Sequence, residues 1–138
     1  MPVVVLDTNV LVSAIRSNRG TSFQVLTSVG TGLFDIAVSV PLVVEYEDAM
    51  LRHVEHSNLK ETDIKDIIDY LCTIAKLQHI YFLWRPLLRD PRDDLVVEVA
   101  IAAGCDAIVT HNRKDFEGVE SLGLRVLTPS AFLKEIRS

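Results

Sequence analysis

Acidic and amide side chains occur at the ends of several elements that the sequence predicts, and side chains of this kind can hold a metal ion. Asp7 directly follows the apolar run of residues 3–6, and Glu45 lies in an early turn of a helix predicted over residues 42–54. The other candidates are Asp93 and Asp94, which open a helix, and Asn112 and Asp115, which follow a strand. Their oxygen atoms are the feature that these positions share.

Gathering such carboxylates in one place has an electrostatic cost. Two carboxylates ~5 Å apart repel by about 3 kcal/mol at an effective dielectric constant of 20, and each raises the pKa of the other unless a cation is present. Hard oxygen ligands suit Mg²⁺ or Mn²⁺, and such ions can activate water against a phosphodiester. No arrangement of thiolates or histidines in the sequence favours zinc.

Apolar runs alternate with helical patterns along the chain, which predicts an α/β domain with a mostly parallel sheet. We expect strands at residues 3–6, 34–40, 80–83, 107–109 and 125–127, and a late apolar helix at 95–103. In a parallel sheet the turns from strand to helix share one edge. Asp7, Glu45 and the 112–115 turn are therefore expected to converge, whereas the long charged loop before Asp94 leaves its position open.

Four segments resemble the PIN domain family, and most closely its VapC-type toxins. They are Asp7-Thr8-Asn9-Val10-Leu11-Val12-Ser13, Glu45, Arg89-Asp90-Pro91-Arg92-Asp93-Asp94 and Thr110-His111-Asn112-Arg113-Lys114-Asp115-Phe116. The resemblance covers nearly the whole chain and implies a single PIN-like nuclease domain over residues 1–138. It implies a three-layer α/β/α sandwich with a central, mostly parallel five-stranded sheet.

The same resemblance implies an endoribonuclease that depends on Mg²⁺ or Mn²⁺ and is the toxin of a toxin-antitoxin system. A cognate antitoxin, an RNA substrate, a homodimer and a cytoplasmic location are then expected. By this resemblance the metal ligands are Asp7, Glu45 and Asp94. The family often has an aspartate where Asn112 stands, so either Asn112 or Asp115 completes the site. Thr8 and Thr110 would orient these groups.

Basic residues lie near the predicted motifs although the formal net charge is −5. Arg89, Arg92 and Arg113 could hold RNA phosphates, or they could simply balance the carboxylates. His53 and His56 are spaced i, i+3 and could hold a metal, but a solvated helix end is the favoured interpretation.

The acidic residues also have structural interpretations. Asp93 is expected to act only as a helix cap, while Asp94 could be both a cap and a ligand. Glu98, one turn later, could reach the site or face solvent. A catalytically inactive PIN-like module that binds RNA or protein is the main alternative, and Asn112 favours it.

Two other α/β classes fit less well. A haloacid-dehalogenase-like phosphatase would need an aspartate where Asn9 stands, and a receiver-like domain would need a lysine where Thr128 stands. The cysteines, Cys72 and Cys105, lack CxxC spacing and are expected to be buried thiols in a reducing compartment. No apolar run approaches the length of a membrane span.

Overall fold

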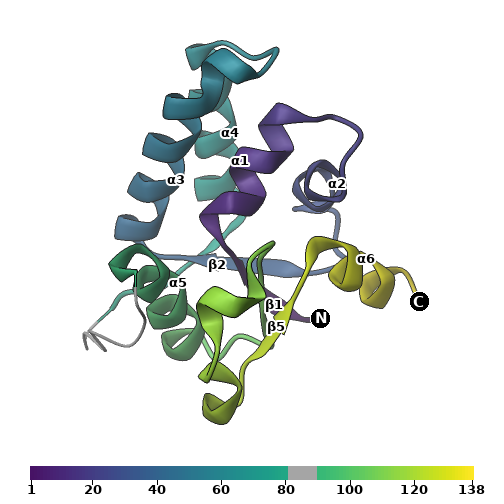
Figure 1. Ribbon diagram of the computed structural model, residues 1–138, viewed down its shortest axis with the longest axis vertical. Helices are drawn as coiled ribbons and strands as arrows, with labels where there is room; N and C mark the ends of the chain where they lie inside the picture. The colour runs from purple at the N-terminus through teal and green to yellow at the C-terminus, as the bar shows by residue number, and fades with distance from the viewer. Residues whose placement is uncertain (81–89) are drawn as a thin grey trace.

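A five-stranded parallel sheet forms the centre of the molecule (Figure 1). The computed structural model describes residues 1–80 and 90–138. The strands lie in the order β3-β2-β1-β4-β5. Their bounds are β1 (Val3–Leu6), β2 (Asp35–Val38), β3 (Lys76–Leu77), β4 (Ala107–Val109) and β5 (Arg125–Leu127). Each neighbouring pair is parallel, so the predicted mostly parallel sheet is confirmed.

Helices flank the sheet on both sides. They are α1 (Thr8–Arg16), α2 (Thr21–Ser28), α3 (Val40–His53), α4 (Glu61–Ile74), α5 (Pro91–Ala102) and α6 (Pro129–Arg137). Short 3₁₀ helices are η1 (Val54–His56), η2 (Arg113–Phe116) and η3 (Val119–Leu122). In Figure 1, α1, α3 and α4 lie above strand β2, and α5 lies below it. The predicted α/β/α sandwich is thereby confirmed.

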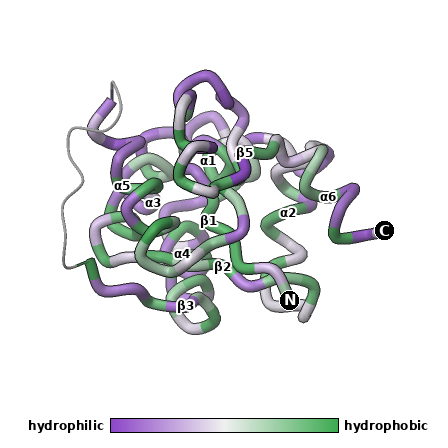
Figure 2. Tube along the Cα trace, turned by 90° about the horizontal axis from the view of Figure 1, so that it is seen from below, coloured by the Kyte–Doolittle hydropathy of each residue, from purple (hydrophilic) through white to green (hydrophobic). Residues whose placement is uncertain are grey.

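The central strands supply much of the core. Val5 and Ile108 are completely buried, and the traces of β1 and β2 are coloured hydrophobic in Figure 2. One thiol departs from expectation, since Cys72 is exposed whereas Cys105 is buried. No helix in the described part of the chain is both long and apolar enough to cross a membrane.

Two elements differ most from those predicted. The third strand is Lys76–Leu77, directly after α4; Ile80 lies outside any strand, and residues 81–83 of the predicted strand lie outside the described residues. Helix α5 begins at Pro91, earlier than expected, because Asp90 is its N-cap and accepts the N–H of Arg92 at 2.9 Å. The expected capping roles of Asp93 and Asp94 are therefore wrong.

The carboxyl ends of three neighbouring strands each lead into a helix at one edge of the sheet. Strand β1 runs through Asp7 into α1. Strand β2 runs through Ser39, whose hydroxyl accepts the N–H of Leu42 at the start of α3. Strand β4 runs through Thr110 towards η2. This edge carries the side chains described next.

Candidate active site

Asp7 is held at the end of β1 by hydrogen bonds on both carboxylate oxygens. Its Oδ1 accepts the backbone N–H of Thr8 at 2.8 Å, which caps α1. Its Oδ2 accepts the hydroxyl of Thr110 at 2.7 Å. Its own backbone N–H donates to the carbonyl of Val109 at 2.9 Å, and its side chain is only 5% exposed. The carboxylate is therefore fixed where strand turns into helix.

The electrostatic surroundings of Asp7 disfavour its negative charge. Burial raises its pKa from 3.8 to about 6, even though the hydrogen bonds from Thr110 and Thr8 lower it. The negative charges of Asp115 and Asp90 raise it further. A positive charge placed beside Asp7 would relieve this cost.

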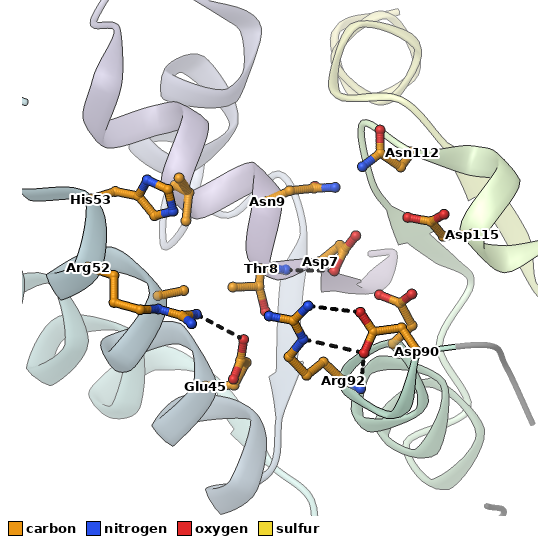
Figure 3. Close-up of a pocket in the computed structure, with 13 residues that line it drawn as sticks. Asp7, Thr8, Asn9, Glu45, Arg52, His53, Asp90, Arg92, Asn112 and Asp115 are labelled. Carbon is orange, nitrogen blue, oxygen red and sulfur yellow. Dashed lines mark hydrogen bonds and ion pairs between the residues drawn. The ribbon is translucent and has the colours of Figure 1, made fainter. Parts of the chain in front are cut away.

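A pocket of about 280 Å³ opens at this edge of the sheet beside Asp7 (Figure 3). Its lining comes from α1, α3, the start of α5 and the segment that follows β4. The predicted site residues that line it are Asp7, Thr8, Glu45, Arg92, Asn112 and Asp115. Residues far apart in the sequence are thus brought to one cavity, as the parallel topology predicts.

Asp93 lines this pocket, and Asp94 does not. Successive residues of a helix point about 100° apart, so the two neighbours face different surroundings, and Asp94 is 0% exposed. The structure therefore assigns the pocket position on α5 to the residue that the sequence suggested was only a cap. Glu98 is also buried, at 4% exposure, and does not face solvent.

The pKa of Asp93 is raised for the same reasons as that of Asp7. Burial raises its pKa from 3.8 to about 7, and the negative charges of Asp7, Asp90 and Asp115 raise it further. The charge of Arg92 lowers it. Acidic groups from three parts of the chain thus contribute to the raised pKa values of Asp7 and Asp93.

Glu45 is positioned by its neighbour in α3. The hydroxyl of Tyr46 donates to the carbonyl of Leu6 at 2.5 Å, which links the middle of α3 to the end of β1. The Glu45 side chain is 16% exposed, and one of its oxygens lies 3.8 Å from the guanidinium of Arg52. The link from α3 to β1 therefore brings a second carboxylate to the pocket wall beside Asp7.

Thr110 connects the segment after β4 to the rest of the site. Besides donating to Asp7, its Oγ1 accepts the backbone N–H of Asn112 at 3.0 Å and the side-chain amide of Asn9 at 3.4 Å. The next residue, His111, donates its backbone N–H to Asn9 at 3.3 Å, and its Nε2 lies 2.5 Å from the hydroxyl of Ser22 on α2. These bonds hold the segment that carries Asn112 against α1 and α2.

The predicted RNA-binding arginines fall in three different places. Arg92 lines the pocket, where its Nε and one terminal nitrogen donate to Asp90 at 3.3 and 3.0 Å. Arg113 is exposed and is not among the lining residues. Arg89 lies outside the described residues. Of the two arginines that are described, Arg92 alone faces the pocket.

Other pocket residues were not among the site residues predicted from the sequence, and His53 was expected at a solvated helix end. They are Asn9, Val12, Ala49, Arg52, His53 and Asp90. A signal for three of them exists, because Ala49, Arg52 and His53 follow Glu45 at intervals of 4, 7 and 8 residues and so share its face of α3. Asp90 could have been recognised as an N-cap, since Pro91 follows it.

The oxygen atoms that line the pocket are of the kind that binds a hard divalent cation, although they do not lie close enough together to form a metal site. The acidic lining groups offer oxygen ligands, which Mg²⁺ and Mn²⁺ prefer, and the raised pKa values of Asp7 and Asp93 indicate negative charge in need of compensation. Within residues 1–80 and 90–138, no three His, Cys, Asp or Glu side chains are close enough to form a metal cluster as they stand. Binding an ion would therefore require side chains to turn inward.

Comparisons with known proteins identify the fold. A sequence profile of the PIN domain matches residues 3–114. No curated protein sequence matches the chain. A chain in the crystal structure of VapBC2 from Rickettsia felis bound to a DNA fragment from their promoter is similar, with a TM-score of 0.62 and 18% identity over 91% of this chain and 98% of that chain.

Proposed function

Because this chain belongs to the PIN domain family, a family of nucleases, we propose that it is an endoribonuclease that requires Mg²⁺ or Mn²⁺. The observation that carries the proposal is the pocket beside Asp7, where acidic side chains from separate parts of the chain face one cavity. A nuclease that uses a divalent ion needs such a pocket, because the ion must be held by oxygen atoms that a phosphodiester can also approach.

Asp7, Glu45 and Asp93 would hold the ion, with Asp115 or Asn112 completing the set. Asp93 takes the place expected for Asp94 because it lines the pocket. A bound ion would supply Lewis acidity towards the phosphodiester and an attacking water. The remaining chemistry belongs to the chain itself, and it consists of orienting ligands and holding the substrate.

Thr8 and Thr110 would act as orienting residues. The Thr110 hydroxyl and the Thr8 backbone N–H direct the two oxygens of Asp7, which restricts the rotation of that carboxylate. Arg92 lies at the mouth of the pocket, 60% exposed, where it could contact a substrate phosphate after leaving Asp90. Arg113, which is exposed and does not line the pocket, would contact the RNA outside it, and we also propose an RNA contact for Arg89, which lies outside the described residues.

The fold similarity to a chain of the Rickettsia felis VapBC2 complex supports a more specific role. We propose that the protein is the toxin of a toxin-antitoxin system, acts in the cytoplasm, forms a homodimer and is inhibited by a cognate antitoxin. Co-expression with the product of the neighbouring gene, followed by purification of a stable complex that lacks ribonuclease activity, tests the partner. Light scattering of the isolated chain tests the dimer.

Cleavage of RNA by purified protein tests the central proposal. Wild type should cleave single-stranded RNA in the presence of Mn²⁺ or Mg²⁺ and lose this activity with a chelator, whereas Asp7→Asn should reduce the rate at least about 100-fold. Arg137→Gln, on the distant helix α6, is the matched control and should cleave as wild type does. Equal cleavage by wild type and Asp7→Asn would refute the proposal.

An inactive PIN-like module that binds RNA or protein is the second candidate, and the amide at Asn112 favours it because an amide is a weaker metal ligand than a carboxylate. Calorimetric titration with Mn²⁺ separates the two functions. Absence of ion binding together with retained RNA binding would favour the inactive module, and Asn112→Asp should then restore affinity for the ion.

A further inference from the structure

The last turn of α3 forms a basic wall of the pocket. Arg52 and His53 both line the cavity, with Ala49 one turn earlier on the same helix. Figure 3 shows Arg52 and His53 on the α3 side of the pocket, whereas Asp90 and Asp115 lie on the other side. The α3 side of the pocket therefore carries Arg52 and His53 beside Glu45, and the opposite side carries Asp90, held by Arg92, and Asp115.

Arg52 is engaged only loosely by the carboxylates near it. Its nitrogens lie 3.8 Å from Glu45 and 3.7 Å from Asp48, which is beyond hydrogen-bond length, and its side chain is 51% exposed. Arg92 differs, because its Nε and a terminal nitrogen already donate to Asp90. Within the described chain, Arg52 is therefore the lining arginine whose donors can turn to a new anion at least cost.

A polyanionic substrate needs such local cations. The chain carries a formal net charge of −5, so long-range attraction does not draw RNA to it. If the scissile phosphate lies beside the acidic groups, the strand must continue out of the pocket and bring its next phosphate to the wall. A guanidinium offers paired N–H donors that match phosphate oxygens, and an imidazole N–H can add another.

We propose that Arg52 and His53 form a second phosphate subsite, which holds the phosphate one nucleotide from the scissile bond in single-stranded RNA. This inference rests on the proposed nuclease function. It assigns the pocket carboxylates to chemistry, and Arg52 and His53 to holding the strand. The subsite adds affinity only for substrates long enough to reach it.

Substrate length tests this assignment. Cleavage of a dinucleotide, which has one phosphodiester, is compared with cleavage of a tetranucleotide, which has three. The Arg52→Gln/His53→Gln variant should raise KM for the tetranucleotide about tenfold, leave its kcat unchanged, and cleave the dinucleotide as wild type does. Arg52→Lys, which keeps the charge, should recover part of the affinity, and Arg137→Gln should match wild type.

A binding measurement separates failure of the subsite from failure of the nuclease function. Short and long RNA oligonucleotides are titrated into wild type and variant in a chelator, which removes the ion that the proposed cleavage requires, and binding is followed by fluorescence anisotropy. The affinity of wild type for the longer oligonucleotide should fall more steeply with salt concentration than that of the variant. The slope of log affinity against log salt should differ by about 0.7 for each phosphate contact that the variant loses. This result supports the subsite even if no RNA is cleaved.

Two outcomes would overturn the subsite. One is an equal loss of affinity for short and long oligonucleotides, or no loss for either. The other is a weakened Mn²⁺ affinity of Arg52→Gln in calorimetry, because that would show Arg52 acting through Glu45, its neighbour at 3.8 Å. Circular dichroism of each variant confirms that the fold is intact before these comparisons are made.

Discussion

At the scale of single residues, Asp7 combines a structural and a chemical role. It caps α1 through the N–H of Thr8, and it presents a carboxylate that is 5% exposed to the pocket. A helix N-terminus favours a negative charge, yet burial outweighs this benefit and raises the pKa to about 6. Burial therefore destabilises the ionised form of Asp7, and a cation bound at this position would stabilise it.

The raised pKa of Asp7 predicts how stability depends on pH in the ion-free protein. The folded pKa lies above the unfolded value, so Asp7 contributes stability that is fully present below pH 4 and is lost as the pH rises through about 6. The difference between a pKa of 3.8 and one of about 6 corresponds to about 3 kcal/mol.

Urea unfolding of wild type and Asp7→Asn, in chelator at pH 4.5 and pH 8, measures this contribution. Relative to wild type, Asp7→Asn should be more stable at pH 8 than at pH 4.5, by up to about 3 kcal/mol. A difference between the two proteins that stays constant with pH would contradict the raised pKa.

The neighbours Asp93 and Asp94 should respond differently to the same substitution. Asp93→Asn removes a pocket carboxylate with a raised pKa, so it should weaken Mn²⁺ binding at least about tenfold and leave the fold stable. Asp94→Asn changes a fully buried side chain and should lower the free energy of unfolding by about 1–3 kcal/mol. Calorimetry and urea unfolding of both variants make the comparison, and the reverse pattern would restore Asp94 as the ligand.

At the scale of elements, the site depends on how helix starts are joined to strand ends. The hydroxyl of Tyr46 ties α3 to the end of β1 through the Leu6 carbonyl, and Thr110 ties the segment after β4 to Asp7. Each connection crosses between neighbouring turns at one edge of the sheet. The separation between Glu45 and Asp7 is therefore set by packing of α3 and not by the flexibility of a loop.

Tyr46→Phe tests the connection between α3 and β1. The loss of one buried hydrogen bond should lower the free energy of unfolding by about 1 kcal/mol and should weaken Mn²⁺ binding, since Glu45 is the adjacent residue. Tyr70→Phe is a matched control, because the Tyr70 hydroxyl donates to the carbonyl of Val29 at 3.0 Å and does not line the pocket. Equal ion affinity in the two variants would show that the Tyr46 bond has no influence on the site.

At the scale of the whole molecule, a divalent ion should stabilise the folded state, because it would connect distant parts of the chain. Its proposed ligands come from the end of β1, from α3 and from α5, and these regions separate on unfolding. An ion that binds only the folded state stabilises it by about 2.7 kcal/mol at 100 times its Kd. Ion binding and folding are therefore linked.

Thermal unfolding with and without Mn²⁺ measures this linkage. Saturating Mn²⁺ should raise the Tm of wild type by about 10 °C at pH 8. The rise should shrink at pH 5, where protons compete for Asp7 and Asp93, and it should vanish in Asp7→Asn. A similar rise in Asp7→Asn would mean that the ion binds elsewhere.

Local sequence signals were sufficient to predict the strand-end position of Asp7. An apolar run of four residues followed by an aspartate predicts a buried strand, and it places the aspartate at the sheet edge where that strand ends. The alternation of such runs with helical patterns also predicted the parallel sheet, because short βα connections allow few other topologies. The 112–115 turn was placed at this edge by the same reasoning, whereas the choice of Glu45 over Glu47 and Asp48 rested mostly on the family resemblance; Glu45, Asn112 and Asp115 all line the pocket.

Only the tertiary structure shows that Asp93, and not Asp94, lines the pocket. Nearly every residue of α5 from Asp94 to Ala100 is buried, so the sequence of this helix shows no apolar stripe from which its rotation could be read. The rotation is fixed by packing against β1, β4 and α3. Arg52 and His53 differ, because their helical spacing to Glu45 indicates a shared face of α3, and the structure adds that this face lines the pocket.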